Sequence, residues 1–195
     1  MLMPKDFNEV QAYTGFTPLE PGGHILVIKK VEETTSKTGN KPMINIYFDT
    51  DKTDSQPEYF TQQYKSNSNP NKKWSNNATI RQLVLDAEGA TNRGFKTFIE
   101  MVEKSNNGFK VQWGDNFCNC FKGKLVGGVF GREEYEKDGA YKFATKHQSF
   151  RTVEDIKNGV EVPADKLLNP SGHNNSNAPD FGDMIPVEDM GKMPF

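Results

Sequence analysis

Apolar and polar residues alternate over two stretches near the start of the chain, and this alternation predicts a β-hairpin. The run "HILVIKKV" at 24–31 is rich in β-branched residues, and "MINIYFD" at 43–49 places Ile44, Ile46 and Phe48 on one side of a strand. Between the two runs, "TSKTGNK" has the Gly and Asn typical of a turn. A third strand is expected at 58–65, "EYFTQQYK". Three strands are therefore expected in the first part of the chain.

The apolar spacing then changes to a helical period, which predicts two helices. Over 77–89, four apolar residues share one helix face, with Asn77 suited to the N-cap and Gly89 to the C-terminal end: Ile80, Leu83, Val84 and Ala87. Over 94–108, a second stripe has the same spacing and ends near Gly108: Phe95, Phe98, Ile99 and Val102. We interpret both stripes as core and not as a cofactor site.

The last third of the chain returns to a β pattern and predicts one long hairpin. Asp138 and Gly139 form a strong two-residue turn signal between two runs within 122–153. Such a turn pairs Lys137 with Ala140, so opposed residue numbers sum to 277. One face then carries Leu125, Val129, Tyr135, Lys142, Ala144, Lys146 and Phe150. The other face mixes aromatic rings with cations and carries Val126, Phe130, Arg132, Tyr141, Phe143, His147 and Arg151.

Glycines are frequent at the start of this hairpin, at Gly123, Gly127, Gly128 and Gly131. They do not fit G-x-G-x-x-G, and the Gly-Lys pair at 123–124 lacks the Ser or Thr of a P-loop. Glycine inside a strand more often marks a bulge or the sharp bend of a small barrel, and we favour the bend. A bulge would change which face each residue lies on in the part of the hairpin beyond Gly131, farther from the turn.

The order of three strands, a helical stretch and a long hairpin is the pattern of an oligonucleotide-binding (OB) barrel. The predicted fold class is mainly β with α: a five-stranded OB-fold barrel with a helical insertion between strands three and four. Prolines and glycines in "TPLEPGG" predict that residues 1–22 form an extended arm before this domain, which we place at 23–168. Residues 169–195 are expected to be a flexible linker and a disordered acidic tail.

Composition agrees with one domain plus appendages, since 34% hydrophobic residues and a mean hydropathy of −0.75 are low for a chain that is compact throughout. The net charge is −2, but the segment from Asp180 onward holds four acids and one lysine, net −3, so the rest of the chain is +1. Any cationic surface must therefore be local.

Candidate chemistry is sparse. Cys118 and Cys120 lie one residue apart, which in a strand points both thiols to one face without disulfide geometry. His24, His147 and His173 are far away in sequence, so neither a metal nor another cofactor is expected. No catalytic arrangement has a recognisable local signature, and we do not expect an enzyme. No run approaches membrane-spanning length, and a reducing cytoplasm is the expected location.

Binding of a single strand without sequence preference needs cations that follow the phosphates and aromatic rings on which bases stack. The mixed hairpin face offers both, in Phe130, Arg132, Tyr141, Phe143, His147 and Arg151. Tyr47, opposite the core stripe of its strand, could extend this face, and an Asn-rich loop adds Lys72, Lys73 and Trp74. Against this interpretation, strand aromatics often only pack, and Glu134 and Glu136 share the face.

Several blocks of the sequence resemble a family of phage and prophage proteins. The blocks are "GHILVIKKVEETTSKTGNKPMINIYFD", "IRQLVLDAEG", "FIEMVEKSNNGF" and "FKGKLVGGVFGREEYEKDG", followed by "SFRTVEDI", and they fall within residues 16–168. The family was first described as a domain of unknown function, is encoded among replication and recombination genes, and is regarded as single-stranded DNA-binding. The resemblance implies that role in phage DNA replication or recombination, inside a bacterial host cell, and brings no catalytic residues.

The final segment is similar to the tail of bacterial single-stranded DNA-binding proteins, with a linker, then acids, then Pro194 and Phe195. The similarity implies that this Pro-Phe end docks on replication or recombination proteins, guided by the acids Asp183, Glu188 and Asp189. The bacterial pattern has aspartates directly before the last three residues, whereas here a Gly and a Lys intervene at 191 and 192. An acidic tail that only solubilises the chain is the alternative.

Two function hypotheses therefore stand beside each other. The first is single-stranded DNA binding, with partner proteins recruited through the tail. The alternative is a protein–protein adaptor or recombination mediator that does not itself bind DNA. The sequence leaves the oligomeric state open, and the N-terminal arm could join copies into a homo-oligomer.

Overall fold

The two strands that the alternation predicts at 24–31 and 43–49 begin the sheet. The structure is a computed structural model that describes residues 2–5, 7, 17–37 and 39–168, and in it β1 (Gly22–Thr35) pairs antiparallel with β2 (Pro42–Thr50). Ile44, Ile46 and Phe48 are all fully buried, so the predicted core face of this hairpin is confirmed.

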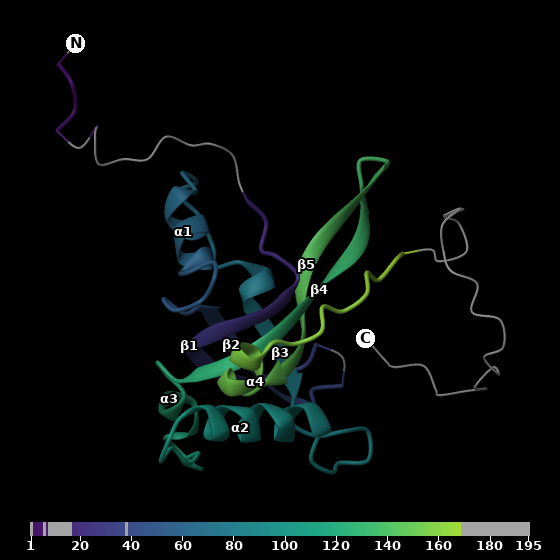
Figure 1. The fold of residues 1–195 in the computed structure, drawn as a ribbon. Coiled ribbons are helices and arrows are strands. Elements are labelled where there is room, and N and C mark those ends of the chain that lie inside the picture. Colours follow the sequence, from purple (N-terminus) through teal and green to yellow (C-terminus); the bar gives the residue numbers. More distant parts are fainter. Residues whose placement is uncertain (1, 6, 8–16, 38, 169–195) are drawn as a thin grey trace.

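Three further strands complete the sheet: β3 (Thr79–Leu83), β4 (Leu125–Lys137) and β5 (Ala140–Arg151). All neighbours are antiparallel, in the order β3-β2-β1-β4-β5, and the sheet curls into a nearly closed barrel (Figure 1). The predicted fold class is therefore confirmed as mainly β, an OB-like barrel with a helix between the third and fourth strands.

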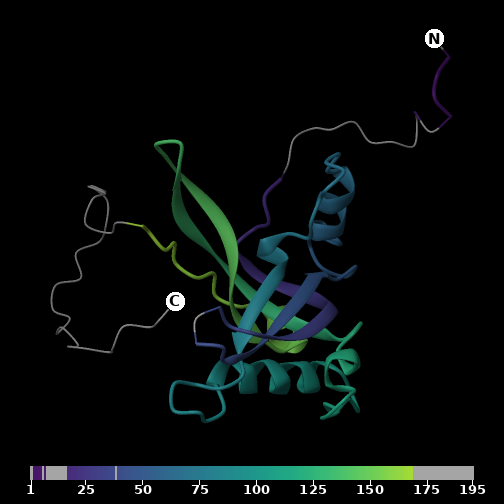
Figure 2. The same cartoon turned by 180° about the vertical axis from the view of Figure 1, so that it is seen from behind.

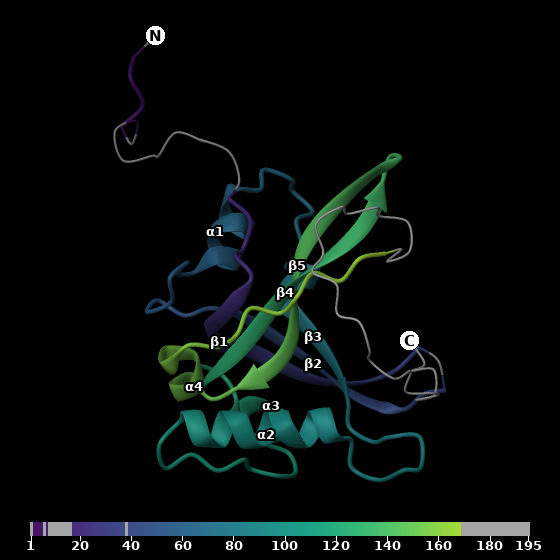
Figure 3. The ribbon, with the colours of Figure 1, turned by 45° about the vertical axis from the view of Figure 1, so that its right-hand side comes forward.

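That helix is α2 (Arg93–Ser105), which lies across one end of the barrel (Figure 3). Its stripe of Phe95, Phe98, Ile99 and Val102 is buried as predicted. The side-chain oxygen of Asn92 accepts hydrogen bonds from the first N–H groups of the helix and so caps it. Two short helices follow, α3 (Phe117–Cys120) and α4 (Val153–Asn158).

Residues 58–65, predicted as a strand, form a helix instead, α1 (Tyr59–Ser66). The reason lies at the end of β2. Fully buried Asp49 accepts hydrogen bonds from the N–H groups of Phe60 at 2.9 Å and Thr61 at 3.2 Å, and Thr50 Oγ1 accepts from the N–H of Tyr59 at 2.9 Å. These tertiary contacts satisfy the free N–H groups of the first helical turn, which local β propensity does not reveal.

The helix predicted at 77–89 is also wrong. The chain there forms a short 3-10 turn, η1 (Asn76–Ala78), and then strand β3, in which Ile80 lies opposite Ile46 and Gln82 opposite Ile44. Asn77 is therefore inside η1 and does not cap an α-helix. Pairing with β2 selects a period of two over the helical spacing of the apolar residues.

The predicted register of the long hairpin is confirmed from the turn as far as Phe130, which lies opposite His147. A β-bulge then leaves Gln148 out of the pairing, and Val129 lies opposite Ser149. Beyond the bulge Phe150 faces the core and Arg151 faces outward. The prediction that Arg151 shares a face with Phe130 is wrong because of this one extra residue.

Glycines of β4 lie where the sheet approaches its neighbours most closely. A Cβ atom on Gly128 would lie 2.7 Å from Leu26 Cδ1, and one on Gly127 would lie 2.5 Å from the Thr152 carbonyl oxygen. No side chain fits at such distances, so close packing explains why glycine is needed here.

Both ends of the described domain pack on the hairpin. Leu19 is buried, and its carbonyl accepts a hydrogen bond from Thr145 Oγ1 at 2.7 Å, so residues 17–21 of the predicted arm belong to the barrel. After α4 the chain runs beside β4, where the N–H of Lys166 donates to the Arg132 carbonyl at 2.9 Å (Figure 1). The linker and tail predicted at 169–195 lie outside the described residues.

Candidate nucleic-acid interface

The inner side of the sheet changes from core to surface along the β4–β5 hairpin. Near the barrel this side carries Phe130 and His147, and towards the turn it carries Arg132, Phe143 and Tyr141. Phe130 is fully buried, whereas Phe143 is 43% and Tyr141 51% exposed. The predicted binding face therefore divides into a core half and an exposed half.

Phe130 is fully buried, and His147 is half-buried with its Nε2 atom inside the protein. The Phe130 ring lies edge-on between the rings of His24, at 5.4 Å, and His147, at 5.5 Å. Burial lowers the pKa of His147 to about 3, and its Nε2 atom has no hydrogen-bond partner in the described part of the chain. His147 is thus neutral near pH 7, so the prediction that it contacts phosphate as a cation is not supported by this geometry.

His24 has the opposite chemistry on the other side of Phe130. Its Nδ1 lies 2.9 Å from Asp54 Oδ1 and its Nε2 lies 2.9 Å from the Glu20 carbonyl oxygen. Burial opposes the charge of His24, but the hydrogen bonds to Asp54 and Glu20 outweigh it and raise its pKa. Because both acceptors need a proton from the ring, His24 is an imidazolium. It connects β1 to Asp54 in the loop after β2.

The exposed half of the face is organised around Arg132. Its guanidinium lies over the Phe143 ring, 5.1 Å from the centroid, and its Nε donates to Asp165 Oδ1 at 2.8 Å, with a second contact from Nη2 to the same carboxylate. The two-point contact fixes the guanidinium plane against the ring. Glu134, which shares this face, is buried, and its carboxylate accepts the N–H of Leu168 at 3.1 Å.

A hollow of about 290 Å³ separates the hairpin from α1. Phe143 and Tyr135 line it from the hairpin, Tyr59 and Gln63 from α1, and Leu19 from the segment before β1. Burial raises the pKa of Tyr59 to about 12, so its hydroxyl is a neutral donor and acceptor at this wall.

Next to this hollow, a second one of about 660 Å³ is lined by Gln63, Tyr64 and Lys73. The Lys72 ammonium lies 4.8 Å from the centroid of the Tyr64 ring, and the Trp74 ring lies 6.0 Å from the same ring. Gln63 and Phe60 line both hollows, so the two hollows adjoin and Lys73 of the predicted Lys72, Lys73 and Trp74 cluster lines the one next to the hairpin hollow.

We call this region the hairpin–α1 surface, which comprises Arg132, Tyr141 and Phe143 of the hairpin with Tyr64, Lys65, Lys72, Lys73 and Trp74 of α1 and the loop after it. Residues 59–85 contain four cations, Lys65, Lys72, Lys73 and Arg81, and no Asp or Glu. An acid-free stretch of this length concentrates positive potential although the whole chain is acidic. The sequence interpretation missed Tyr64 and Lys65, because it assigned α1 to a strand.

Tyr47 lies on the other side of the sheet from the hairpin rings. It faces outward from β2, opposite Lys30 and Thr79, and its hydroxyl donates to Glu32 Oε2 at 2.9 Å. Figure 2 shows β2 and its neighbours β1 and β3 from the side opposite to the view of Figure 1. Lys30 also pairs with Glu32, and these two contacts lower the pKa of Glu32. The register thus contradicts the prediction that Tyr47 extends the mixed hairpin face. Arg81, also outward on β3, escaped notice because its strand was assigned to a helix.

Cys118 and Cys120 lie on the short helix α3 and not on a strand, and both are free thiols. Among residues 2–5, 7, 17–37 and 39–168, no group of three or more His, Cys, Asp or Glu side chains is placed to hold a metal ion. Within the same residues, every helix is too short or too polar to cross a bilayer. The predicted tail residues Asp183, Glu188, Asp189, Pro194 and Phe195 lie outside the described chain.

Comparison with protein-family models and with curated proteins finds no match to this chain, so its function is argued from the geometry above.

Proposed function

We propose that the protein binds single-stranded DNA without sequence preference on the hairpin–α1 surface. The observation that carries the proposal is the emergence of Phe143 and Tyr141 from the inner side of the barrel, next to a segment whose charges are all positive. Exposed rings accept unstacked bases and the lysines accept phosphates, which are the two contacts that non-specific single-strand binding requires.

Each part of the surface has a distinct role in this proposal. Phe143 and Tyr141 stack bases. Asp165 holds the Arg132 guanidinium over the Phe143 ring, where it can contact the bound DNA. Lys65, Lys72 and Lys73 contact the phosphates, and Trp74 supports the Tyr64 ring from the side. A duplex keeps its bases stacked on one another and so gains only the phosphate contacts.

The biological setting of the proposal rests on the sequence resemblance. By that resemblance, the protein acts in phage DNA replication or recombination and recruits partner enzymes through its acidic tail and Phe195. The tail lies outside the described residues, so its proposed role is tested separately from the hairpin–α1 surface.

Fluorescence anisotropy of a labelled oligo-dT strand, titrated with the full chain at low and moderate salt, tests the proposal. We expect salt-sensitive binding that unlabelled duplex does not displace. The double variant Phe143→Ala, Tyr141→Ala removes two stacking rings and should weaken binding by about 1–3 kcal/mol for each base that loses its ring. Trp113→Ala, which removes an exposed ring far from this surface, should leave the affinity for a short strand unchanged.

Unaltered affinity in the double variant, with circular dichroism equal to the parent's, would contradict the proposed surface. No binding of oligo-dT by the parent would remove the proposal altogether. The adaptor hypothesis, in which the barrel presents protein-binding surfaces and never contacts DNA, would then be the better account.

A further inference from the structure

The end of the barrel closed by α2 carries the most exposed aromatic ring of the described barrel domain. Trp113 is 67% exposed although one face of its indole stacks on Phe117, with centroids 5.3 Å apart and planes 17° from parallel. This stacking and an edge contact with the Phe95 ring, 6.4 Å between centroids, hold the indole in place while most of it remains exposed. A large rigid ring held in this way is typical of an anchor for a partner.

Trp113 forms one wall of an open pocket of about 580 Å³ between α2, α3 and the adjoining ends of β1 and β2. The pocket is mostly apolar, and its apolar lining consists of Pro42, Met43, Ile44, Val84, Phe95 and Phe117. Glu33 and Asp115 are the two carboxylates at its edge. No Lys or Arg of the described chain lines it, so phosphate is disfavoured and the pocket suits an apolar segment with a nearby cation.

A segment of that chemistry lies at the N-terminal end of the same chain. Leu2, Met3 and Phe7 are 94%, 66% and 62% exposed, and Lys5 lies among them. The N–H of Phe7 donates to the Pro4 carbonyl at 3.2 Å, so a turn brings the apolar residues on either side of Pro4 closer together. Three large apolar side chains in one short exposed segment need a surface to cover them.

The arm joins the barrel far from the Trp113 pocket. Residues 17–21 enter beside α1 and β5, where Leu19 binds Thr145, whereas α2 and α3 lie at the opposite end of the barrel (Figure 1). An arm that leaves from one end suits the pocket of a neighbouring molecule better than its own.

We propose that residues 2–7 of a second copy of this chain dock in the Trp113 pocket. Leu2, Met3 and Phe7 fill the apolar hollow against Trp113 and Phe95, while Lys5 faces the carboxylates of Glu33 and Asp115. Since Asp6 follows Lys5 in the sequence, the apolar contacts carry most of the affinity and the charges mainly set the orientation. Reciprocal exchange of arms closes a two-fold dimer, and one-way docking builds a longer chain of copies.

Sedimentation velocity of the full chain over a range of concentrations tests the proposal. We expect association of the parent, and loss of that association both in Trp113→Ala and in the triple variant Leu2→Ser, Met3→Ser, Phe7→Ser. Mixing the two variants should restore a one-to-one complex, because one supplies an intact arm and the other an intact pocket. Val162→Ser, which alters an exposed apolar residue outside both elements, should associate like the parent.

A charge exchange refines the test, since Lys5→Glu and Asp115→Lys should each weaken association and together should restore part of it. A parent that stays monomeric at every concentration, or a variant mixture that forms no complex, would overturn the proposal. Oligo-dT binding by the Trp113→Ala variant is a separate measurement, so failure of the arm contact and failure of DNA binding can be told apart.

Discussion

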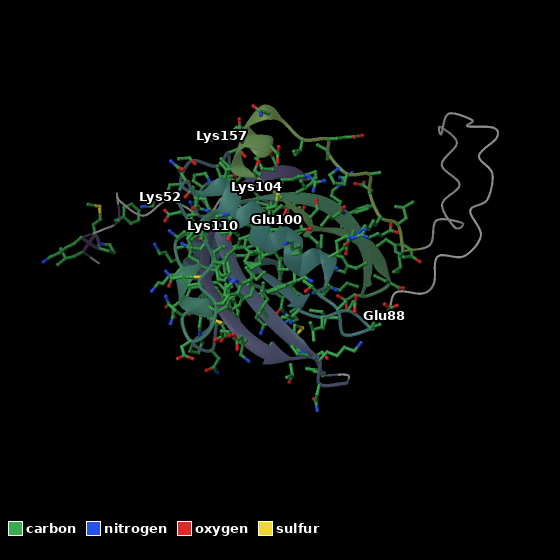
Figure 4. All side chains as sticks on the ribbon, turned by 90° about the horizontal axis from the view of Figure 1, so that it is seen from below. Lys52, Glu88, Glu100, Lys104, Lys110 and Lys157 are labelled. Atoms are coloured by element: carbon green, nitrogen blue, oxygen red, sulfur yellow. The ribbon has the colours of Figure 1, made fainter. Side chains whose placement is uncertain are left out.

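Two cations of the hairpin–α1 surface lie over rings, although Arg132 also pairs with Asp165, while at the α2 end three lysines lie beside carboxylates. Lys72 lies over Tyr64 and Arg132 over Phe143. Lys96 and Lys104 both pair with Glu100, and Lys110 pairs with Glu103 at 2.7 Å. Figure 4 shows Glu100, Lys104 and Lys110 on the side of the molecule seen from below. The two ends therefore offer different potentials to a ligand even though both contain lysines and aromatic rings.

The difference shows why the net charge of a chain says little about its ligand. Exposed ion pairs contribute little to stability, but they neutralise a surface, and a neutralised surface attracts phosphate only weakly. The acid-free stretch 59–85 has no such carboxylates of its own, and its lysines form no ion pair with the described residues, so they can attract an anion. The aromatic pocket at Trp113 has only carboxylates as its charged lining and is suited to a protein segment.

The largest expected effect concerns the core beneath the hairpin end, at His147. Its pKa of about 3 in the folded chain lies below the ordinary value of 6.5, so between these values the unfolded chain binds the proton and the folded chain does not. Stability should fall as the pH drops from 6.5 towards 3, by up to about 4 kcal/mol. Urea unfolding of the parent and of His147→Phe at several pH values in that window measures the difference.

The His147→Phe variant should lose less stability than the parent on acidification, because the replacement ring cannot take up a proton. His24→Gln is the matched control, since the raised pKa of His24 places its contribution below pH 6.5 and removes it only as the pH rises through the folded value. Equal acid sensitivity in the parent and His147→Phe would show that His147 does not limit stability at low pH.

A somewhat smaller effect on stability is expected from the caps of α1 and α2, the helices at the two ends of the barrel. Asp49→Ala removes the buried carboxylate that caps α1 and leaves the N–H groups of Phe60 and Thr61 without an acceptor, which should cost about 3 kcal/mol. Oligo-dT affinity should fall as well, because α1 carries Tyr64 and Lys65 of the hairpin–α1 surface. Asn92→Ala at α2 removes an ordinary helix cap, should cost about 1 kcal/mol, and should leave DNA affinity unchanged.

Urea unfolding and anisotropy on the same two variants provide both readouts. If Asn92→Ala lowered DNA affinity as much as Asp49→Ala does, general destabilisation would explain the loss and the two ends would not be distinct in function.

Asp49 also shows which parts of the fold could be predicted from the sequence. The β1–β2 hairpin, α2 and the β4–β5 turn have strong local signals, because period and turn chemistry are contained in a few adjacent residues. The helix α1 depends on a carboxylate from another element, and β3 on pairing with β2, so local patterns misassigned both. The barrel was still predicted correctly, since the two errors exchanged a strand and a helix within the same part of the chain.

The candidate site was predicted in part for the same reason. The alternation around the Asp138-Gly139 turn places Arg132, Phe143 and Tyr141 on one face correctly, but it does not show where the barrel ends and the hairpin becomes exposed. Phe130 and His147 were therefore included, although Phe130 belongs to the core and His147 is half-buried beside it. Arg151 was misplaced by a bulge at Gln148, for which the residues carry no clear signal.

A smaller effect is expected from the lysines themselves. Lys72→Ala, Lys73→Ala should reduce the slope of log affinity against log salt by about 0.7 for each phosphate that the variant no longer neutralises. The matched pair Lys96→Ala, Lys104→Ala removes two lysines that already face Glu100, and it should leave the slope nearly unchanged. Anisotropy titrations at several salt concentrations give both slopes, and equal changes in the two double variants would mean that free and paired lysines do not differ as proposed.

The smallest expected effect comes from the acidic segment beyond the described residues. Residues 180–195 are net −3, and at low salt their carboxylates should compete weakly with DNA for the lysines of the hairpin–α1 surface. Deleting the segment should therefore tighten oligo-dT binding a few-fold at low salt, and the gain should vanish as salt rises. The variant Asp183→Asn, Glu188→Gln, Asp189→Asn keeps the length and Phe195 and should reproduce most of the gain if charge is the cause. An affinity that is the same in the parent, the deletion and the neutralised variant would mean that the acids do not reach the cationic end, leaving partner recruitment as their remaining proposed role.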